Sequence, residues 1–174
     1  VEALINSAVK SPERDDALII FVLNQTNVKI GFTKFSQLLA KDPLSLTALE
    51  FIEKSTSKSF IEETIEYIKE IVRPEVYDYM KDNSTLVLPP QFFALSKWHE
   101  VLLNKMIQFH LMDYDYIWQV LHFPDHIVRV KVIELLKSLK LLNKKEVRLF
   151  LYPVYKDEMD RELKNEFEKI VWQR

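Results

Sequence analysis

Apolar residues recur at intervals of three and four along most of this 174-residue chain, which is the spacing of one buried helix face. The longest run predicts a helix over residues 91–112, with a stripe of Leu95, Trp98, Leu102, Met106 and Phe109. A second stripe follows Ser59 and consists of Ile61, Ile65, Ile68 and Val72. The pattern therefore predicts an all-α fold, either a helical bundle or a short α-solenoid, of about seven to nine helices.

Polar residues and prolines mark the expected helix starts. These signals are Asp42-Pro43, Ser59 with Glu62, Asp113, Pro124-Asp125, Asn143 with Glu146, and Pro153 before a final helix. Shorter helices are expected over residues 2–9, 12–24, 33–41 and 75–81. Because the connections are short, consecutive helices are expected to be antiparallel neighbours.

The chain is expected to form a single domain over residues 1–174, because its length suits one hydrophobic core. Residues 83–90 are the expected internal joint, since residues 85–88 precede Pro89-Pro90 and a residue before proline avoids helical backbone angles. The chain starts at Val1 and has apolar residues up to Trp172, so we expect it to be a fragment of a larger protein.

Composition excludes several classes of function. Gly31 is the only glycine, which argues against glycine-rich phosphate loops and hairpin-rich β folds. The absence of cysteine excludes disulfides, thiolate metal sites and a cysteine nucleophile. Neither a leader pattern nor an apolar stretch of bilayer length is visible in the sequence. We therefore expect an intracellular protein, cytoplasmic or nuclear, without a membrane partner.

One segment resembles a known repeat family. Pro124-Asp125-His126-Ile127-Val128-Arg129, followed by Val132, Ile133, Leu135 and Leu136, resembles the turn and second helix of a HEAT-type repeat. The resemblance covers about one unit, near residues 114–141, with residues 116–121 as its first helix. It implies that Asp125 and Arg129 tie neighbouring repeats together. Asp42-Pro43 lies 83 positions upstream of Asp125, close to two periods of a roughly 40-residue HEAT or armadillo unit.

Histidines form the only cluster with metal-ligand residue types. His122 and His126 are four residues apart, with His110 and Asp113 nearby. Pro124 separates them and is expected to end one helix before the next begins, so the two rings do not share a helix face. We expect turn histidines, one of them bonding a carbonyl group, and no metal site.

Carboxylate pairs such as Glu62-Glu63 and the pair Asp113 and Asp115 are the remaining candidates for acid–base chemistry. Acidic residues at helix starts are expected anyway, because the helix dipole favours negative charge there. No Ser/His/Asp order or nucleophile elbow accompanies them. The expectation is a protein that is not an enzyme, with no catalytic residue, no cofactor and no small-molecule substrate.

Charge is distributed unevenly although the net charge is only −2. Residues 129–148 contain two carboxylates and seven cations, for a local charge of +5; the cations are Arg129, Lys131, Lys137, Lys140, Lys144, Lys145 and Arg148. Residues 50–82 have a local charge of −4. A basic face of this kind suits phosphate contacts with RNA or DNA, and the alternative is an ordinary solvated helix face.

Aromatic residues make up 12% of the chain, and several flank expected loops or helix ends. Exposed aromatic side chains suit partner recognition, since they are enriched in the cores of protein interfaces. The segment 77–93 is the preferred exposed candidate because it is apolar yet interrupted by turn signals. Its candidate binding residues are Tyr77, Tyr79, Leu86, Leu88, Phe92 and Phe93.

The leading hypothesis is a helical protein–protein interaction module of a larger intracellular scaffold or assembly factor. The alternative is an RNA- or DNA-contacting helical domain that uses the basic face of residues 129–148.

Overall fold

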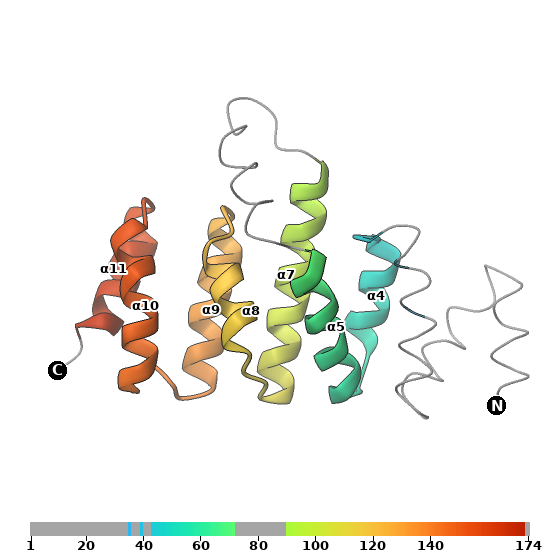
Figure 1. The fold of residues 1–174 in the computed structure, drawn as a ribbon, viewed down its shortest axis with the longest axis horizontal. Coiled ribbons are helices and arrows are strands. Elements are labelled where there is room, and N and C mark those ends of the chain that lie inside the picture. Colours follow the sequence, from blue (N-terminus) through green and yellow to red (C-terminus); the bar gives the residue numbers. More distant parts are fainter. Residues whose placement is uncertain (1–34, 36–38, 40–42, 72–89, 173–174) are drawn as a thin grey trace, which may run out of the picture.

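The computed structural model describes residues 35, 39, 43–71 and 90–172. These residues form helices and no strand, so the all-α prediction is confirmed. The helices are α4 (Leu46–Lys54), α5 (Lys58–Ile71), α7 (Pro90–Phe109), α8 (Tyr114–Leu121), α9 (His126–Ser138), α10 (Lys145–Asp157) and α11 (Arg161–Val171) (Figure 1). The helices predicted over 2–9, 12–24 and 75–81, and the joint predicted at 83–90 except for Pro90, lie outside the described residues.

The helices stand side by side in two layers, and they form a row with α4 towards one end and α10 and α11 at the other (Figure 1). In one layer α7 packs between α4 and α9, and α9 packs in turn against α11. The second layer contains α5, α8 and α10, which pack against α7, α9 and α11 respectively. Helices that follow one another in the chain therefore alternate between the layers. The prediction that consecutive helices are neighbours fits α8 with α9 and α10 with α11, whereas α7 packs mainly on α9, the helix after the next.

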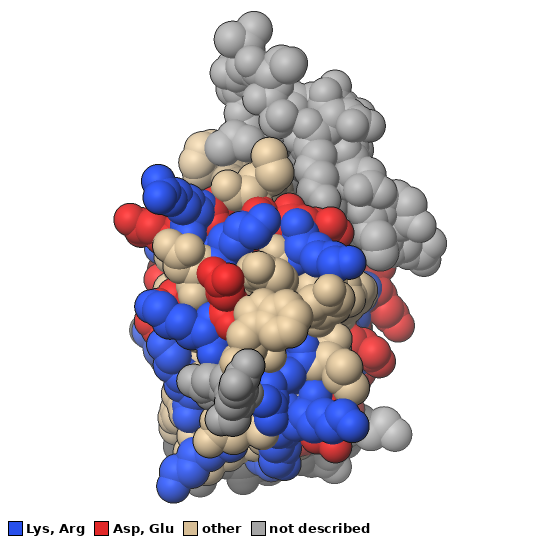
Figure 2. Space-filling model, turned by 90° about the vertical axis from the view of Figure 1, so that its left-hand side faces the viewer, with Lys and Arg blue, Asp and Glu red and all other residues tan. Residues whose placement is uncertain are grey.

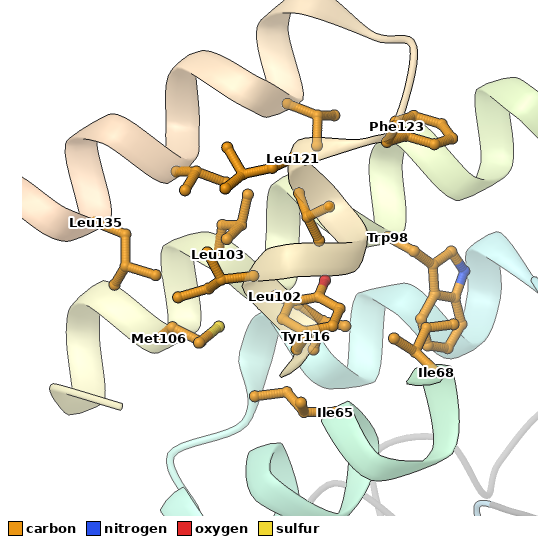
Figure 3. Packing of buried hydrophobic residues seen from close by; sticks show 14 of the residues in the cluster. Ile65, Ile68, Trp98, Leu102, Leu103, Met106, Tyr116, Leu121, Phe123 and Leu135 are labelled. Atoms are coloured by element: carbon orange, nitrogen blue, oxygen red, sulfur yellow. The ribbon is translucent and has the colours of Figure 1, made fainter. Parts of the chain in front are cut away.

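The core runs along the seam between the two layers and is centred on α7, the longest helix. Trp98, Leu102, Leu103 and Met106 of α7 are fully buried. Figure 3 shows them beside Ile65 and Ile68 of α5, Tyr116 and Leu121 of α8, and Leu135 of α9. At the α4 end Phe35 and Leu39 are also helical and fully buried, which agrees with the helix predicted over 33–41.

Two predicted helix starts are confirmed by the side chains that cap them. The Asp113 carboxylate accepts a hydrogen bond from the backbone N–H of Tyr116 at 2.8 Å, and α8 begins directly after it. The Asp125 carboxylate accepts one from the N–H of Ile127, also at 2.8 Å, at the start of α9. Aspartate is a strong N-cap because it satisfies an otherwise unbonded N–H of the first turn.

Three other predicted starts are wrong by a few residues. α4 begins after Ser45, whose hydroxyl accepts from Ala48, and not at Asp42-Pro43. In α5 the hydroxyl of Ser57 accepts from the N–H of Phe60 at 3.4 Å, so Ser59 lies inside the helix. The N-cap of α10 is Lys144, without a side-chain cap bond, in place of the predicted Asn143 box.

Pro153 does not precede the last helix but lies inside α10. Proline removes one helix hydrogen bond and crowds the preceding turn. Here the Pro153 ring is exposed, while Leu151 and Val154 on either side of it are buried against the core. Packing of the apolar face therefore keeps the helix intact at the proline. The last helix begins after Asp160, whose carboxylate accepts a hydrogen bond from the N–H of Leu163.

Polar side chains tie helices to the turns of their neighbours. Lys105 of α7 donates to the Ser55 carbonyl in the α4–α5 turn at 2.8 Å. Lys69 of α5 forms an ion pair with Asp113, the cap of α8, at 2.9 Å. These contacts fix how far each helix slides along the next, because apolar packing alone has little directional preference.

Candidate functional site

The aromatic segment predicted to be exposed is described only at its C-terminal end. Tyr77, Tyr79, Leu86 and Leu88 lie outside the described residues. The prediction is wrong for Phe92, which is 6% exposed and stacks on Phe123 with ring centroids 5.1 Å apart. It is confirmed for the exposure of Phe93, at 60%. The adjacent residues differ because successive residues of a helix point about 100° apart.

The basic stretch of residues 129–148 does not form one open face. The Arg129 guanidinium lies 3.2 Å from the Glu158 carboxylate, with the two side chains 15% and 4% exposed. Lys131 pairs with Glu134 at 2.7 Å, and Lys137 pairs with Glu166 at 3.6 Å. Three of the seven predicted nucleic-acid contacts are therefore engaged within the chain.

The other four cations surround the turn between α9 and α10. Lys140, Lys144 and Lys145 are exposed, and the backbone of Lys140 has a positive φ of 56° at the start of the turn, directly after the C-cap of α9. Arg148 donates to the Asn143 carbonyl at 3.3 Å and is half-buried. Only this turn therefore remains as a candidate for the predicted basic face.

Two of the three turn histidines contact a backbone carbonyl, where one such contact was predicted, and the third lies beside an acid. His122 Nδ1 lies 2.7 Å from the Trp118 carbonyl, and His110 Nδ1 lies 3.0 Å from the Ile107 carbonyl. His126 Nδ1 lies 3.1 Å from the Asp160 carboxylate. Within the described ranges no group of three metal-ligand residues is close enough to hold an ion.

A fourth histidine, His99, is fully buried in α7, and the sequence analysis did not single it out. Its Nδ1 lies 2.9 Å from the Tyr116 hydroxyl, and its ring contacts Phe123 edge-on at 5.0 Å. Burial lowers the pKa of His99 to about 3, and the charge of Asp125 opposes this only in part. A neutral imidazole paired with a tyrosine stabilises the α7–α8 packing and does not act as an acid or base at neutral pH.

Asp125 and Arg129, to which the HEAT resemblance gives a role between repeats, bond to the helix and the turns around them. Asp125 accepts a hydrogen bond from the Ser96 hydroxyl of α7, and Arg129 donates to the Phe123 carbonyl at 3.1 Å as well as to Glu158. The first contact joins the α8–α9 turn to α7, and the second joins it to the α10–α11 turn. Membership of the HEAT family stays a prediction, because many helical proteins bond their turns in this way.

The outer side of α10 and α11 points away from α8 and α9 at one end of the row (Figure 1). Its centre is an aromatic cluster in which Tyr152 lies 6.0 Å from Trp172 and 6.4 Å from Tyr155, measured between ring centroids. Trp172 is 59% exposed, and both tyrosines are half-buried. A tryptophan this exposed is uncommon, since the side chain is highly buried on average.

We define the end face as the set of residues that helical spacing places on this outer side. It consists of Lys145, Arg148, Leu149, Tyr152, Tyr155 and Lys156 of α10, with Arg161, Lys164, Glu168 and Trp172 of α11 and its C-cap. Five of these residues are cations and one is a carboxylate. Figure 2 shows this end of the molecule, where an uncharged patch has several lysine and arginine side chains and an acidic side chain beside it.

Two of the lysines lie over the aromatic rings. Lys156 Nζ is 5.1 Å from the Tyr152 ring centroid, and Lys164 Nζ is 5.6 Å from that of Tyr155. Lys164 also donates to the Glu158 carbonyl at 3.3 Å. Among the described residues, neither ammonium group has a carboxylate within ion-pair distance. Cation–π contact holds both charges close to the apolar patch and leaves their other N–H donors available.

The carboxylates of α11 are concentrated on its opposite side. Glu162 and Glu166 line a hollow against α9 together with His126 and Lys137. Hydrogen bonding from Lys169, with further attraction from Lys137, holds the pKa of Glu166 below its usual value. Glu162 and Glu166 of this helix are therefore directed towards the stack together with Lys169, whereas Arg161, Lys164 and Glu168 lie on the end face.

Comparison with known proteins found no family model, no curated protein and no solved structure that matches the chain. In the described part of the chain, no helix has the length and apolar character needed to cross a bilayer.

Proposed function

We propose that this chain is a non-enzymatic protein–protein interaction module of a larger intracellular scaffold or assembly factor, and that the end face contacts the partner. The observation that carries this proposal is the exposed cluster of Tyr152, Tyr155 and Trp172. Tyrosine, tryptophan and arginine dominate the energetic centres of protein interfaces, where one buried tryptophan commonly contributes about 2 kcal/mol or more.

The architecture supports the same proposal. In a stack of helices each element contacts mainly its neighbours, and among the described helices α10 and α11 have neighbours on one side only, so their other side faces outward. Capping pairs are usually polar on that side. Here α10 and α11 combine aromatic rings with cations, which is the composition of an interface more than of a simple cap. We propose on this basis that the fold is a short HEAT-like solenoid whose end is a docking site.

The experiment compares two exposed aromatic residues that lie in different parts of the chain. Trp172→Ala changes the end face, and Phe93→Ala changes the segment preferred from sequence; their exposures are 59% and 60%. Each variant and the parent chain is used to capture proteins from a cell lysate, at low and high salt and with and without nuclease. We expect proteins that resist nuclease and are lost with Trp172→Ala but retained with Phe93→Ala.

Loss with Phe93→Ala alone would place the partner at the segment 77–93 instead. Partners that disappear with nuclease would show tethering through nucleic acid. If neither the parent chain nor any variant captures a specific protein, the proposed interaction module is contradicted. Circular dichroism of both variants checks that the fold is unchanged, since neither side chain contributes much buried surface.

Nucleic-acid binding stays the second candidate function, and the observation that favours it is the cluster of exposed lysines at the α9–α10 turn. Lys140, Lys144 and Lys145 changed together to Glu should abolish phosphate contacts there, and the parent affinity should fall steeply as salt rises. Equal affinity for RNA or DNA before and after the change would exclude this turn as the site.

A further inference from the structure

We infer that the end face binds an acidic amphipathic helix of a partner protein, which packs across α10 and α11 as the next helix of the stack. This inference rests on the proposed function and adds the chemistry of the partner. It requires a surface that fits a helix, an apolar centre for the buried stripe, and cations placed for the flanking carboxylates.

The surface fits a helix because it is itself the side of two packed helices. Along α10 the residues Lys145, Leu149, Tyr152 and Lys156 follow at helical spacing and make one straight ridge. Ridges of this kind accept a further helix at an axis distance of roughly 8–10 Å. Inside the protein, α9 packs on α7 and α11 packs on α9 in the same manner.

The centre of the ridge is an exposed apolar surface that a partner helix can cover. Leu149 is 64% exposed and Trp172 is 59% exposed, with Tyr152 between them in the ring cluster. An amphipathic helix presents residues at positions i, i+3, i+4 and i+7 to such a groove. Aliphatic side chains at those positions would cover these three residues.

The positive charge of the end face favours an acidic partner helix. The end face carries five cations and one carboxylate, Glu168, although the whole chain has a net charge of −2. Lys156 and Lys164 are held at the edge of the ring cluster, where a carboxylate on the partner would meet them without having to displace an internal acid. Complementary charge around an apolar centre raises the association rate and selects against basic partners.

The same observations favour a protein over a nucleic acid. A base that stacked on Tyr152 or Tyr155 would have to compete with the ammonium group already over each ring. The exposed aliphatic Leu149 suits a leucine or isoleucine of a helix and offers nothing to a nucleotide. The net negative charge of the chain also weakens long-range attraction of a polyanion.

The test measures fluorescence anisotropy with the full chain and a labelled synthetic helix of about 18 residues, or roughly five turns. The probe carries a leucine stripe flanked by glutamates, and a second probe has glutamine at every glutamate position. A uridine oligonucleotide serves as the third probe. We expect the acidic helix to bind about tenfold more tightly than the neutral helix at roughly 0.1 M salt.

Two variants with matched changes of charge locate the site. Lys156→Glu with Lys164→Glu should weaken binding of the acidic helix about tenfold or more and leave the neutral helix little changed. Lys54→Glu with Lys58→Glu makes the same change in net charge in α4 and α5, towards the other end of the row, and should alter the affinity less than about threefold. Tyr152→Ala with Trp172→Ala should weaken both helices.

The inference is overturned if the acidic helix does not bind, if both helices bind equally, or if the two charge variants have equal effects. Tighter binding of the oligonucleotide, lost with Lys156→Glu and Lys164→Glu, would assign the face to nucleic acid. Self-association of the parent chain that the same variant abolishes would assign the face to a second copy. Proteins captured through Trp172 without preference for the acidic probe would retain the proposed function and reject only this partner chemistry.

Discussion

At the scale of single residues, His99 links stability to pH. Its pKa of about 3 in the folded protein lies below its ordinary value of 6.5, so the unfolded chain binds more protons between these limits. The contribution of His99 is complete above pH 6.5 and is lost as the pH falls towards 3. We expect the free energy of unfolding to fall by about 2.5 kcal/mol between pH 7 and 4.5 from this residue.

The variant His99→Gln isolates that effect, because an amide bonds the Tyr116 hydroxyl but does not titrate. Urea unfolding of both proteins across this range should give curves that converge as the pH falls. Parallel curves would show that the pKa of His99 is the same in the folded and unfolded states, contrary to its burial.

The ion pair between Arg129 and Glu158 is the residue contact on which the end of the stack most depends. Removing one partner leaves the other charge buried, so Arg129→Met should cost about 3 kcal/mol or more. Lys131→Met removes an exposed pair from the same helix and should cost less than about 1 kcal/mol. Equal losses in denaturant unfolding would show that the Arg129 contact is open to solvent.

At the scale of elements, the position of the α5 cap gives a direct test with its own control. Ser57→Ala removes the hydroxyl that accepts from Phe60 and should cost about 1 kcal/mol in the free energy of unfolding. Ser59→Ala changes a serine two residues away that lies within the helix, and should cost little or slightly stabilise the protein. If Ser59→Ala cost more stability than Ser57→Ala, the capping box predicted from sequence at Ser59 would be the correct helix start.

The elements that sequence patterning predicted well are those whose signal is local. Asp113 and Asp125 cap helices because a short carboxylate reaches the first-turn N–H groups whatever lies around it. The start of α5 was misplaced because it depends on a turn at Ser55, whose hydroxyl accepts from Ser57 and whose carbonyl accepts from Lys105, 50 residues away. A contact between residues so far apart in the sequence cannot be recognised from the local pattern of residues.

The end face was missed for a related reason. Ending α10 at Pro153 separates Tyr152 from Lys156 and conceals that both lie on one ridge. The buried neighbours of Pro153 keep the helix intact, which is a consequence of tertiary packing. If the helix is taken to continue to Asp157, the ridge can be recognised from sequence by the helical spacing of Lys145, Leu149, Tyr152 and Lys156.

At the scale of the whole molecule, the row of helices predicts that stability varies along the stack. Phe167→Ala opens a cavity between α11 and its neighbours, and Leu102→Ala opens one in α7 at the centre; each should cost roughly 3–5 kcal/mol if the site does not collapse. Because α11 packs only at the end, we expect Phe167→Ala to raise amide exchange mainly in α10 and α11.

Leu102→Ala should instead raise exchange in α4, α5, α7 and α9 together, since α7 contacts the other three. Hydrogen exchange measured by mass spectrometry separates the two patterns. Uniform exchange in every described helix for both variants would show a single cooperative unit, as in a closed bundle.

The alternation of consecutive helices between two layers also has a consequence for how fast the chain folds. Each described helix finds its neighbours within one or two elements along the sequence, so few contacts require a long loop to close first. Proteins with such a low contact order reach the native state in microseconds to milliseconds. We expect α7, α8 and α9, in which α9 packs against both other helices, to form the nucleus from which the rest of the row can grow.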